Sequence, residues 1–206
     1  MTPERLTTGD TEAVVDVLTD AFAGYPVMCY VLDGRADASD PRLRTLVGFF
    51  VRARVWRDHP VLGVRDGGDL VAVATITPPV PGPVPPALTG LRDAVWTELG
   101  DGARERYEAF GRACERFAID EAHHHLNMIG VRSSHQGRGL ARPLLDAVHD
   151  LADDDPGSAG VTLSPEAPAN LPLYERFGYR RVGHETVADE LETWGFWRPS
   201  ERSVHG

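Results

Sequence analysis

The sequence predicts a single domain of the α/β class, and three observations support this prediction. The chain has 206 residues, 42% of them hydrophobic, which suits one domain with a substantial core. Residues 127–141 have the pattern of a buried strand, a glycine-rich turn and the first turn of a helix. Residues 61–76 have the pattern of a β-hairpin, with amphipathic helices before and after it. We therefore expect residues 1–206 to form one domain.

The N-terminal part of the chain predicts two helices followed by the hairpin. Asp10 is a plausible N-cap for the first helix. The apolar residues of that helix recur at helical spacing: Val14, Val15, Leu18 and Phe22. A turn-rich segment over residues 33–41 precedes a second helix over residues 42–57. The hairpin turns at the Asp-Gly-Gly-Asp run of residues 66–69.

The middle of the chain predicts a helical insertion at about residues 79–120, before the strand at residues 123–131. Proline recurs from Thr77 to Pro86, so that segment should be an extended connector. Two helices should follow over residues 88–99 and 102–118. Further strands are expected over Gly160–Glu166 and, as the last two, within the region from Thr186 to Trp197.

The glycine-rich turn after the strand at residues 127–131 predicts an anion site. Pro143 is tolerated mainly in the first turn of a helix, so the helix should begin within a residue or two of Gly139. The amides of residues 138–142 would then be unpaired at the positive end of the helix dipole, which favours phosphate. Arginines at positions 132, 138 and 142 add positive charge to this region of a chain whose formal net charge is −10.

Composition excludes several functions. All 21 basic residues are arginine, so a P-loop, a pyridoxal Schiff base and a lysine nucleophile are ruled out. The acidic balance argues against nucleic acid and anionic membranes as partners. No apolar run approaches the length of a membrane span and no secretion signal is evident, so we expect a cytoplasmic protein. Cys29 and Cys114 match no metal spacing and should be free, partly buried thiols.

Two ordered motifs resemble those of the GCN5-related N-acetyltransferases (GNAT). The run Gln136–Ala141 fits the QxxGxA/G pyrophosphate loop of that family, and Asn170–Tyr179 fits its NxxxYxxxGF segment. The layout is most similar to puromycin N-acetyltransferase-like members, and the motif-specific part is residues 123–183. The resemblance implies a mixed, mostly antiparallel central sheet of about six or seven strands flanked by helices. It also implies acetyl-CoA as the acyl donor, with no metal.

The resemblance also assigns residues to acetyl-CoA. The assigned residues are Ile129, Gly130, Val131, Gln136, Gly137, Arg138, Gly139, Leu140, Ala141, Arg142, Asn170 and Tyr174. Backbone amides near residues 129 and 130 would stabilise the oxyanion, and the hydroxyl of Tyr174 would face the thioester sulfur. We expect Asn170 to cap the helix that follows it and to touch the cofactor.

Acetylation requires a neutral amine, and an alkylammonium with a pKa near ~10.4 must first lose a proton. His125 is the candidate base, because it occupies the position where the family often carries a Glu or His; Glu121 and Glu166 are in reserve. Strict alternation along the strand would place His125 on one face with Asn127, Ile129 and Val131, while His124, Leu126 and Met128 take the other. The alternative is that the three histidines have no catalytic role and form a polar strand edge. At most His123 and His125 converge, which disfavours a metal site.

The resulting functional prediction is acetyl transfer to the primary amine of a small molecule, by direct attack in a ternary complex. Two alternatives stay open: a protein lysine or N-terminal acetyltransferase, and a non-catalytic acyl-CoA sensor. A covalent route through Cys29 is disfavoured, and a homodimer is one option. Aromatic residues of the N-terminal half could line the acceptor pocket, and two acids could attract a cationic amine. These residues are Phe22, Tyr25, Tyr30 and Trp56, with Asp33 or Asp37.

Overall fold

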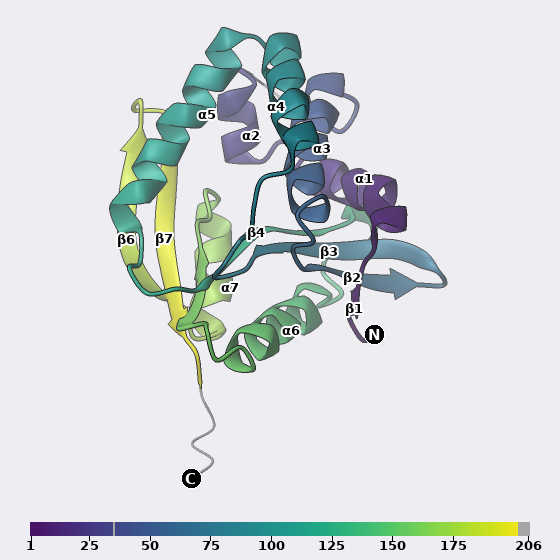
Figure 1. The fold of residues 1–206 in the computed structure, drawn as a ribbon, viewed down its shortest axis with the longest axis vertical. Helices are drawn as coiled ribbons and strands as arrows, with labels where there is room; N and C mark the ends of the chain where they lie inside the picture. Colours follow the sequence, from purple (N-terminus) through teal and green to yellow (C-terminus); the bar gives the residue numbers. More distant parts are fainter. Residues whose placement is uncertain (35, 202–206) are drawn as a thin grey trace.

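In the computed structural model, which describes residues 1–34 and 36–201, seven strands form one sheet in the order β1-β2-β3-β4-β5-β7-β6 (Figure 1). The strands are β1 (Glu4–Arg5), β2 (Val61–Asp66), β3 (Asp69–Thr77), β4 (His124–Val131), β5 (Gly160–Leu163), β6 (Arg180–Val187) and β7 (Leu191–Pro199). β4 and β5 are parallel, and the other neighbouring pairs are antiparallel. The predicted mixed, mostly antiparallel sheet is confirmed.

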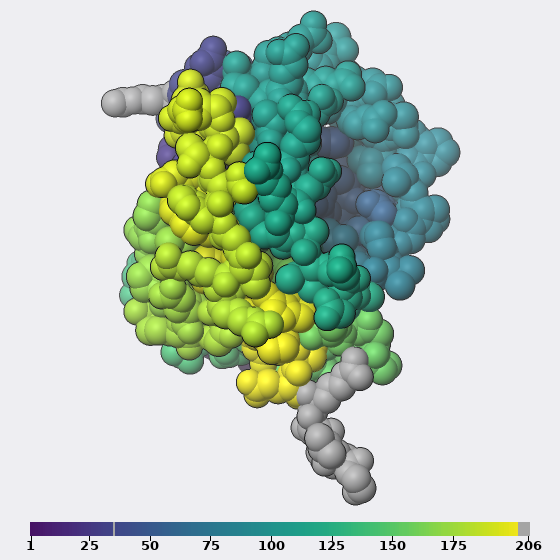
Figure 2. Space-filling view, turned by 90° about the vertical axis from the view of Figure 1, so that its left-hand side faces the viewer, coloured from purple at the N-terminus to yellow at the C-terminus, as the bar shows by residue number. Residues whose placement is uncertain are grey.

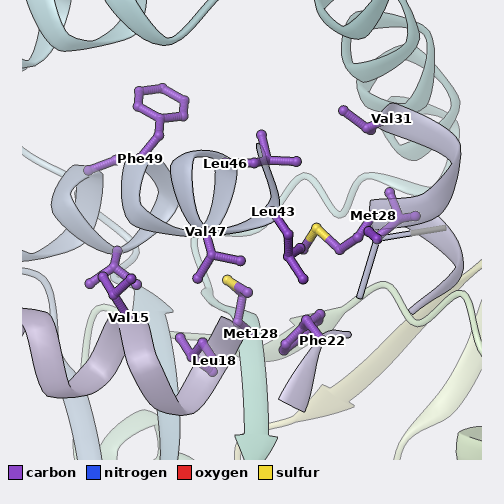
Figure 3. Packing of buried hydrophobic residues seen from close by; sticks show 14 of the residues in the cluster. Val15, Leu18, Phe22, Met28, Val31, Leu43, Leu46, Val47, Phe49 and Met128 are labelled. Carbon is purple, nitrogen blue, oxygen red and sulfur yellow. The ribbon is translucent and has the colours of Figure 1, made fainter. Parts of the chain in front are cut away.

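Helices cover both faces of this sheet (Figure 1). One face carries α1 (Thr11–Ala21), α2 (Pro26–Val31), α3 (Pro41–Val55), α4 (Pro86–Leu99) and α5 (Asp101–Cys114), whereas the other carries α6 (Ala141–Asp153) and α7 (Leu171–Arg176). Each face has its own apolar core. Figure 3 shows the first core beneath α3, where Met28, Leu43 and Met128 point toward one another. The second core lies between the sheet and α6, with Leu144 and Leu145 fully buried.

Several helix boundaries differ from the sequence predictions because of capping residues. Proline provides the first residue of α3 and α4, so both helices begin earlier than predicted. Asp40 caps α3 by accepting a hydrogen bond from the Arg42 amide. Asp10 precedes α1 as predicted, but its carboxylate does not cap that helix; it accepts from the Thr7 amide and closes a preceding 3-10 turn.

Other elements were missed or misplaced by the sequence pattern. The short helix α2 was not predicted, and β6 begins at Arg180, six residues before the predicted start of the last strands. β5 ends at Leu163 instead of Glu166, because the chain leaves β4 at that point. α5 ends at Cys114, and a 3-10 turn over Glu115–Phe117 completes the predicted helical stretch.

A bulge in β4 breaks the alternation that the sequence predicted. Thr75 pairs with Met128, but the next residue of β3, Ile76, pairs with Leu126, so Asn127 is an extra residue in β4. Met128 therefore packs in the core beneath α3, whereas Ile129 packs on the α6 side with Leu126. The predicted grouping of His125 and Asn127 with Ile129 and Val131 on one face is wrong for this reason.

The bulge coincides with the place where β4 and β5 separate. The two strands pair only at His124↔Val161 and His125↔Thr162. Beyond His125, the described part of β4 has no strand partner on the β5 side. An opening is thus left in the middle of the sheet, between β4 and the segment that follows β5.

The C-terminal end of the α5 region is fixed against β6 and β7. In the space-filling view, α5 (teal) lies directly beside these strands and closes this side of the molecule (Figure 2). The buried ring of Phe117 sits over a pair of facing glycines, Gly183 and Gly195. A Cβ at Gly195 would lie 2.5 Å from the Phe117 ring, so only glycine leaves room for it.

We expect Gly195→Ala to lower the free energy of unfolding by about 1–3 kcal/mol, because the added methyl group overpacks the contact with Phe117. The matched control is Gly90→Ala on the exposed side of α4, where a Cβ meets no atom within 4 Å. The control should be neutral or gain about 0.5–1 kcal/mol from its helix propensity. Urea denaturation of the three proteins measures both changes, and an unchanged midpoint for Gly195→Ala would contradict the packing argument.

Candidate active site

The opening between β4 and β5 contains a narrow cavity of about 50 Å³. Both strands contribute to its walls, together with the turn that follows α1 and α7 with the turn before it. The lining residues are Phe22, Tyr25, Leu126, Asn127, Met128, Ile129, Leu163, Ser164, Pro165, Glu166, Asn170 and Tyr174. Of the residues predicted to bind the cofactor, this cavity brings together Ile129, Asn170 and Tyr174.

The glycine-rich loop lies where β4 leads into α6, and its geometry suits an anion. Gly137 and Gly139 both have φ near +76°, a region that L-residues with side chains rarely adopt. α6 begins at Ala141 and has 13 residues, so its dipole points its positive end at the loop. Among the described residues, the amides of 138–141 donate to no protein acceptor. These amides are available for a phosphate group.

One amide in this loop departs from the prediction. The Arg142 amide donates to the Gly139 carbonyl at 3.2 Å, because the chain makes a turn before the helix proper begins. The side chain of Arg142 lies over the Phe177 ring, with 5.0 Å from Cζ to the ring centroid. Arg138 lies 3.7 Å from the Asp66 carboxylate, which offsets part of the local positive charge.

The other predicted cofactor residues build the loop and the strand that leads into it. The Gln136 side chain donates to the Val131 carbonyl at 3.2 Å and so ties the loop to the end of β4. Gly130 lies beneath α1, where a Cβ would come within 2.7 Å of the Ala21 side chain. Leu140 is buried in the α6 core, so only its backbone faces the loop. These residues are placed to support an anion site through the main chain.

A second cavity, of about 520 Å³, lies between α5 and the sheet. Residues from α2, α3, α5, β3, β4 and the segment after β5 line it, together with Phe22, which follows α1. The lining residues are Phe22, Val27, Met28, Val31, Leu46, Phe50, Arg54, Thr75, Tyr107, Glu108, Phe110, Gly111, Arg112, Cys114, Glu115, His125, Asn127, Met128, Ser164 and Glu166. Phe22, Asn127, Met128, Ser164 and Glu166 also line the narrow cavity, so the two spaces adjoin.

Glu166 lies at this junction and is 5% exposed. Its amide donates to the Tyr25 hydroxyl at 3.2 Å, and its carboxylate accepts from the Thr193 hydroxyl at 3.4 Å. Burial raises the pKa of Glu166 to about 8, since these hydrogen bonds only partly compensate the loss of water around the charged form. Its carboxyl group can therefore exchange a proton near neutral pH.

His125 lines the large cavity from β4, close to the same junction. Its Nδ1 lies 2.9 Å from the Thr162 hydroxyl, which orients the ring. Burial, followed by the positive charge of Arg54, lowers the pKa of His125 to about 4. His125 is neutral at pH 7 and is a weak base.

Tyr174 is buried, and its ring packs on Tyr179 and Phe196. Burial and the nearby Glu166 raise the pKa of Tyr174, so its hydroxyl keeps its proton. Asn170 stands at the N-cap position of α7 as predicted, but its side chain makes no capping hydrogen bond. Its side chain instead lines the narrow cavity near the Tyr25 hydroxyl.

The aromatic lining differs from the sequence prediction. Phe22 lines both cavities and Tyr25 the narrow one, but Tyr30 lines neither, and Trp56 is 41% exposed. Aromatic residues of the insertion and of α3 take their place: Phe50, Tyr107 and Phe110. The acids suggested for a cationic amine, Asp33 and Asp37, line neither cavity, and the same holds for Glu121.

Sequence reasoning missed Arg54, which reaches the large cavity from the last turn of α3. Its Nε donates to the Asn127 side chain at 3.1 Å. Arg54 lies two residues before the exposed Trp56. Nothing in the sequence around it distinguishes it from the other arginines of that helix. Cys29 and Cys114 are free thiols, as predicted, and Cys114 lines the cavity.

Comparison with known proteins points to one family. Residues 103–194 match the family model described as an acetyltransferase (GNAT) domain. This part of the chain is similar to GNAT acetyltransferase domains. Within residues 1–34 and 36–201, no helix is long and apolar enough to cross a membrane, and no three His, Cys, Asp or Glu side chains come together as a metal site.

Solved structures share the GNAT fold over nearly the whole chain. A protein from Corynebacterium glutamicum, described as histone acetyltransferase HPA2 and related acetyltransferase, has 23% identity and a TM-score of 0.70, with 98% of both chains covered. The C-terminal condensation domain of Ebony, solved with beta-alanyl-dopamine, has 11% identity and a TM-score of 0.63, covering 96% of this chain and 97% of that domain.

A third similar structure contains the acyl donor. The putative acetyltransferase yncA from Salmonella typhimurium, solved with its cofactor acetyl-CoA, has 16% identity and a TM-score of 0.54. The alignment covers 100% of this chain and 97% of that one. These likenesses concern the fold.

Proposed function

We propose that this protein transfers the acetyl group of acetyl-CoA to the primary amine of a small molecule, by direct attack in a ternary complex. The observation that carries the proposal is the pair of adjoining cavities, with the loop before α6 offering free amides to a diphosphate. The narrow cavity between β4 and β5 would hold the thioester end of the donor. The large cavity would hold the acceptor, and Glu166 lies where the two meet.

We also propose that residues 1–206 act as one domain. Support comes from the sheet, which combines β1 near the N-terminus with β7 near the C-terminus. The insertion at residues 79–120 contributes α5, whose residues line the acceptor cavity.

Glu166 is a better general base than His125 on physical grounds. A base works best when its pKa lies near the working pH. The pKa of Glu166 is raised to about 8, so its anion is a strong base that still forms near neutral pH. The pKa of His125 is lowered to about 4, which makes proton transfer from an ammonium group steeply uphill. We therefore assign the role of general base to Glu166, and His125 remains the competing prediction.

The groups at the junction can account for each proton and bond that the reaction moves. The Glu166 carboxylate takes the proton released by the amine, and the amine nitrogen forms the bond to the carbonyl carbon. Backbone amides near residues 129 and 130 are the proposed donors to the developing oxyanion. The carbon–sulfur bond breaks, and the departing thiolate takes up the second amine proton and leaves as the CoA thiol. The Tyr174 hydroxyl, which keeps its own proton, donates a hydrogen bond to the sulfur as it departs.

Enclosure supports a small molecule over a protein as the acceptor. A lysine side chain or N-terminus presented by a folded protein needs an open groove, whereas α5, which packs along β6 and β7, forms one wall of the acceptor cavity. A silent acyl-CoA sensor would have no use for a buried carboxyl group that can exchange a proton at the junction of the two cavities.

The loop before α6 should bind the donor. Isothermal titration of the purified protein with acetyl-CoA is expected to show one binding site. Gly139→Val should weaken acetyl-CoA binding by roughly tenfold or more, because a valine held at a φ of +76° carries about 1–3 kcal/mol of backbone strain. Gly82→Val is the matched control, since Gly82 also has a positive φ but lies in the connector before α4. Absence of binding to both acetyl-CoA and CoA would overturn the proposed function.

Glu166→Gln should lower the rate of CoA release by about 10²–10⁴-fold with the best acceptor from a panel of primary amines, aminonucleosides and peptides. The ratio of wild-type to variant rate at each pH cancels the titration of the acceptor itself. Because only the deprotonated Glu166 accepts a proton, this ratio should rise with pH and level off above a pKa of about 8. Acetyl-CoA affinity should be unchanged.

His125→Gln provides the discriminating comparison. If Glu166 is the base, this variant should lose much less activity and should keep the wild-type pH profile. A flat ratio for Glu166→Gln, together with a large loss for His125→Gln, would return the role to His125.

Tyr174→Phe should lower kcat by about tenfold to a thousandfold, because the leaving thiolate loses a hydrogen-bond donor. Tyr179→Phe is a matched control: Tyr179 is equally buried, but its hydroxyl bonds to His149 and it lines neither cavity. Steady-state kinetics of the two variants give the comparison. Equal rates for Tyr174→Phe and wild type would remove Tyr174 from the mechanism.

A further inference from the structure

Arg54 is a guanidinium on the inner wall of the acceptor cavity. It extends from the last turn of α3, and its Nε donates to the Asn127 side chain at 3.1 Å. Asn127 also accepts from the Thr77 hydroxyl at 2.8 Å, so the residue that forms the β4 bulge is held from two sides. Arg54 is thereby fixed in position before any acceptor arrives.

No acid compensates this cation. Within residues 1–34 and 36–201, Arg54 forms no ion pair, although the other three arginines of α3 do: Arg42 pairs with Asp40, and Arg44 and Arg52 pair with Glu12. Burial lowers the pKa of Arg54, and the neighbouring charge of Arg57 acts in the same direction. A partly buried cation without a counter-charge is costly, and such groups in proteins are normally paired.

The other charged groups of the cavity leave that position open. Glu108 and Arg112 on α5, and Glu115 in the 3-10 turn that follows it, are exposed residues of the cavity lining. Glu166 is buried on the other side of the opening, after β5, and hydrogen-bonds to Thr193 and not to Arg54. The inner cavity therefore presents a basic group on the β3–β4 side and a proton acceptor on the β5 side.

We infer that the acceptor is an amino carboxylate with an apolar body, whose carboxylate binds Arg54 while its amine faces Glu166. This inference rests on the proposed acetyl transfer and names the substrate class for the same site. The free Nη donors of a guanidinium match a carboxylate in a fork geometry, and the pair becomes strong once water is excluded. Much of the remaining lining is apolar: Phe22, Val27, Met28, Leu46, Phe50 and Phe110.

The test uses acceptors that differ only at the carboxylate. One set is phenylalanine, phenylalaninamide and phenethylamine; a second set, 6-aminohexanoate, its amide and hexylamine, has a longer separation between amine and carboxylate. CoA release gives kcat and KM for each, and isothermal titration in the presence of CoA gives affinity without chemistry. The proteins are wild type, Arg54→Gln, Arg54→Lys and the control Arg57→Gln, whose native arginine donates to the connector at Pro81 and Gly82 and does not line the cavity.

In at least one set, the carboxylate should bind wild type about tenfold to a hundredfold more tightly than its amide and amine, as expected for a charge-assisted hydrogen bond. Arg54→Gln should abolish that preference by raising KM and Kd for the carboxylate, with little change for the neutral amines. Arg54→Lys should restore part of it, and Arg57→Gln should leave it intact. This dependence on the acceptor's charge separates ligand binding from a role of Arg54 in holding the β4 bulge, which would affect all acceptors equally.

Equal affinity for the three members of both sets, or a carboxylate preference that survives Arg54→Gln, would overturn the inference. Failure of the proposed function looks different. If the carboxylates bind through Arg54 but no acceptor releases CoA, amino carboxylates are ligands of the cavity and the proposed acetyl transfer is wrong. If neutral amines are acetylated as well as carboxylates, acetyl transfer stands and the inference falls.

Discussion

The structure depends on the failure of β4 and β5 to remain paired. Parallel strands normally continue their ladder, but these two pair only at His124 and His125 before they separate. The bulge at Asn127 redirects β4, and Pro165, which has no amide hydrogen, lies in the segment that leaves β5. Without this separation, backbone hydrogen bonds would join every pair of neighbouring strands and the sheet would be continuous. The separation leaves an opening in the sheet. Both cavities are built against this opening, so the catalytic proposal and the acceptor proposal have the same structural origin.

Burial on the two sides of the opening sets opposite chemical properties. The pKa of Glu166 rises and the pKa of His125 falls for the same reason, since a low-dielectric environment disfavours the charged form of each group. A carboxyl group becomes a competent base near neutral pH, whereas an imidazole loses that capacity. The identity of the base therefore follows from solvation more than from residue type, and it could not be decided from a sequence in which histidine is the usual group that titrates near pH 7.

The sequence predicted the parts of this protein that are encoded locally. Gly137, Gly139 and Pro143 impose the loop and the start of α6, so an anion site could be placed from them before the fold was known. The hairpin between β2 and β3 follows in the same way from its Asp-Gly-Gly-Asp turn. Features that depend on distant partners were missed. The bulge at Asn127 is visible only in the register with β3, and period-two alternation consequently placed Met128 and Ile129 on the wrong faces.

Arg54 is a second feature that depends on distant partners, and the sequence did not predict its place in the cavity. Its neighbours in sequence belong to an amphipathic helix with several arginines, and only the packing of α3 over β4 turns one of them inward, against Asn127. The insertion that contributes α5 forms part of the cavity wall, and the partial burial of Arg54 makes an unpaired guanidinium costly and a carboxylate ligand correspondingly favourable. Burial and substrate charge are therefore linked: a guanidinium fully exposed to solvent would be screened and would give little preference for an anionic acceptor.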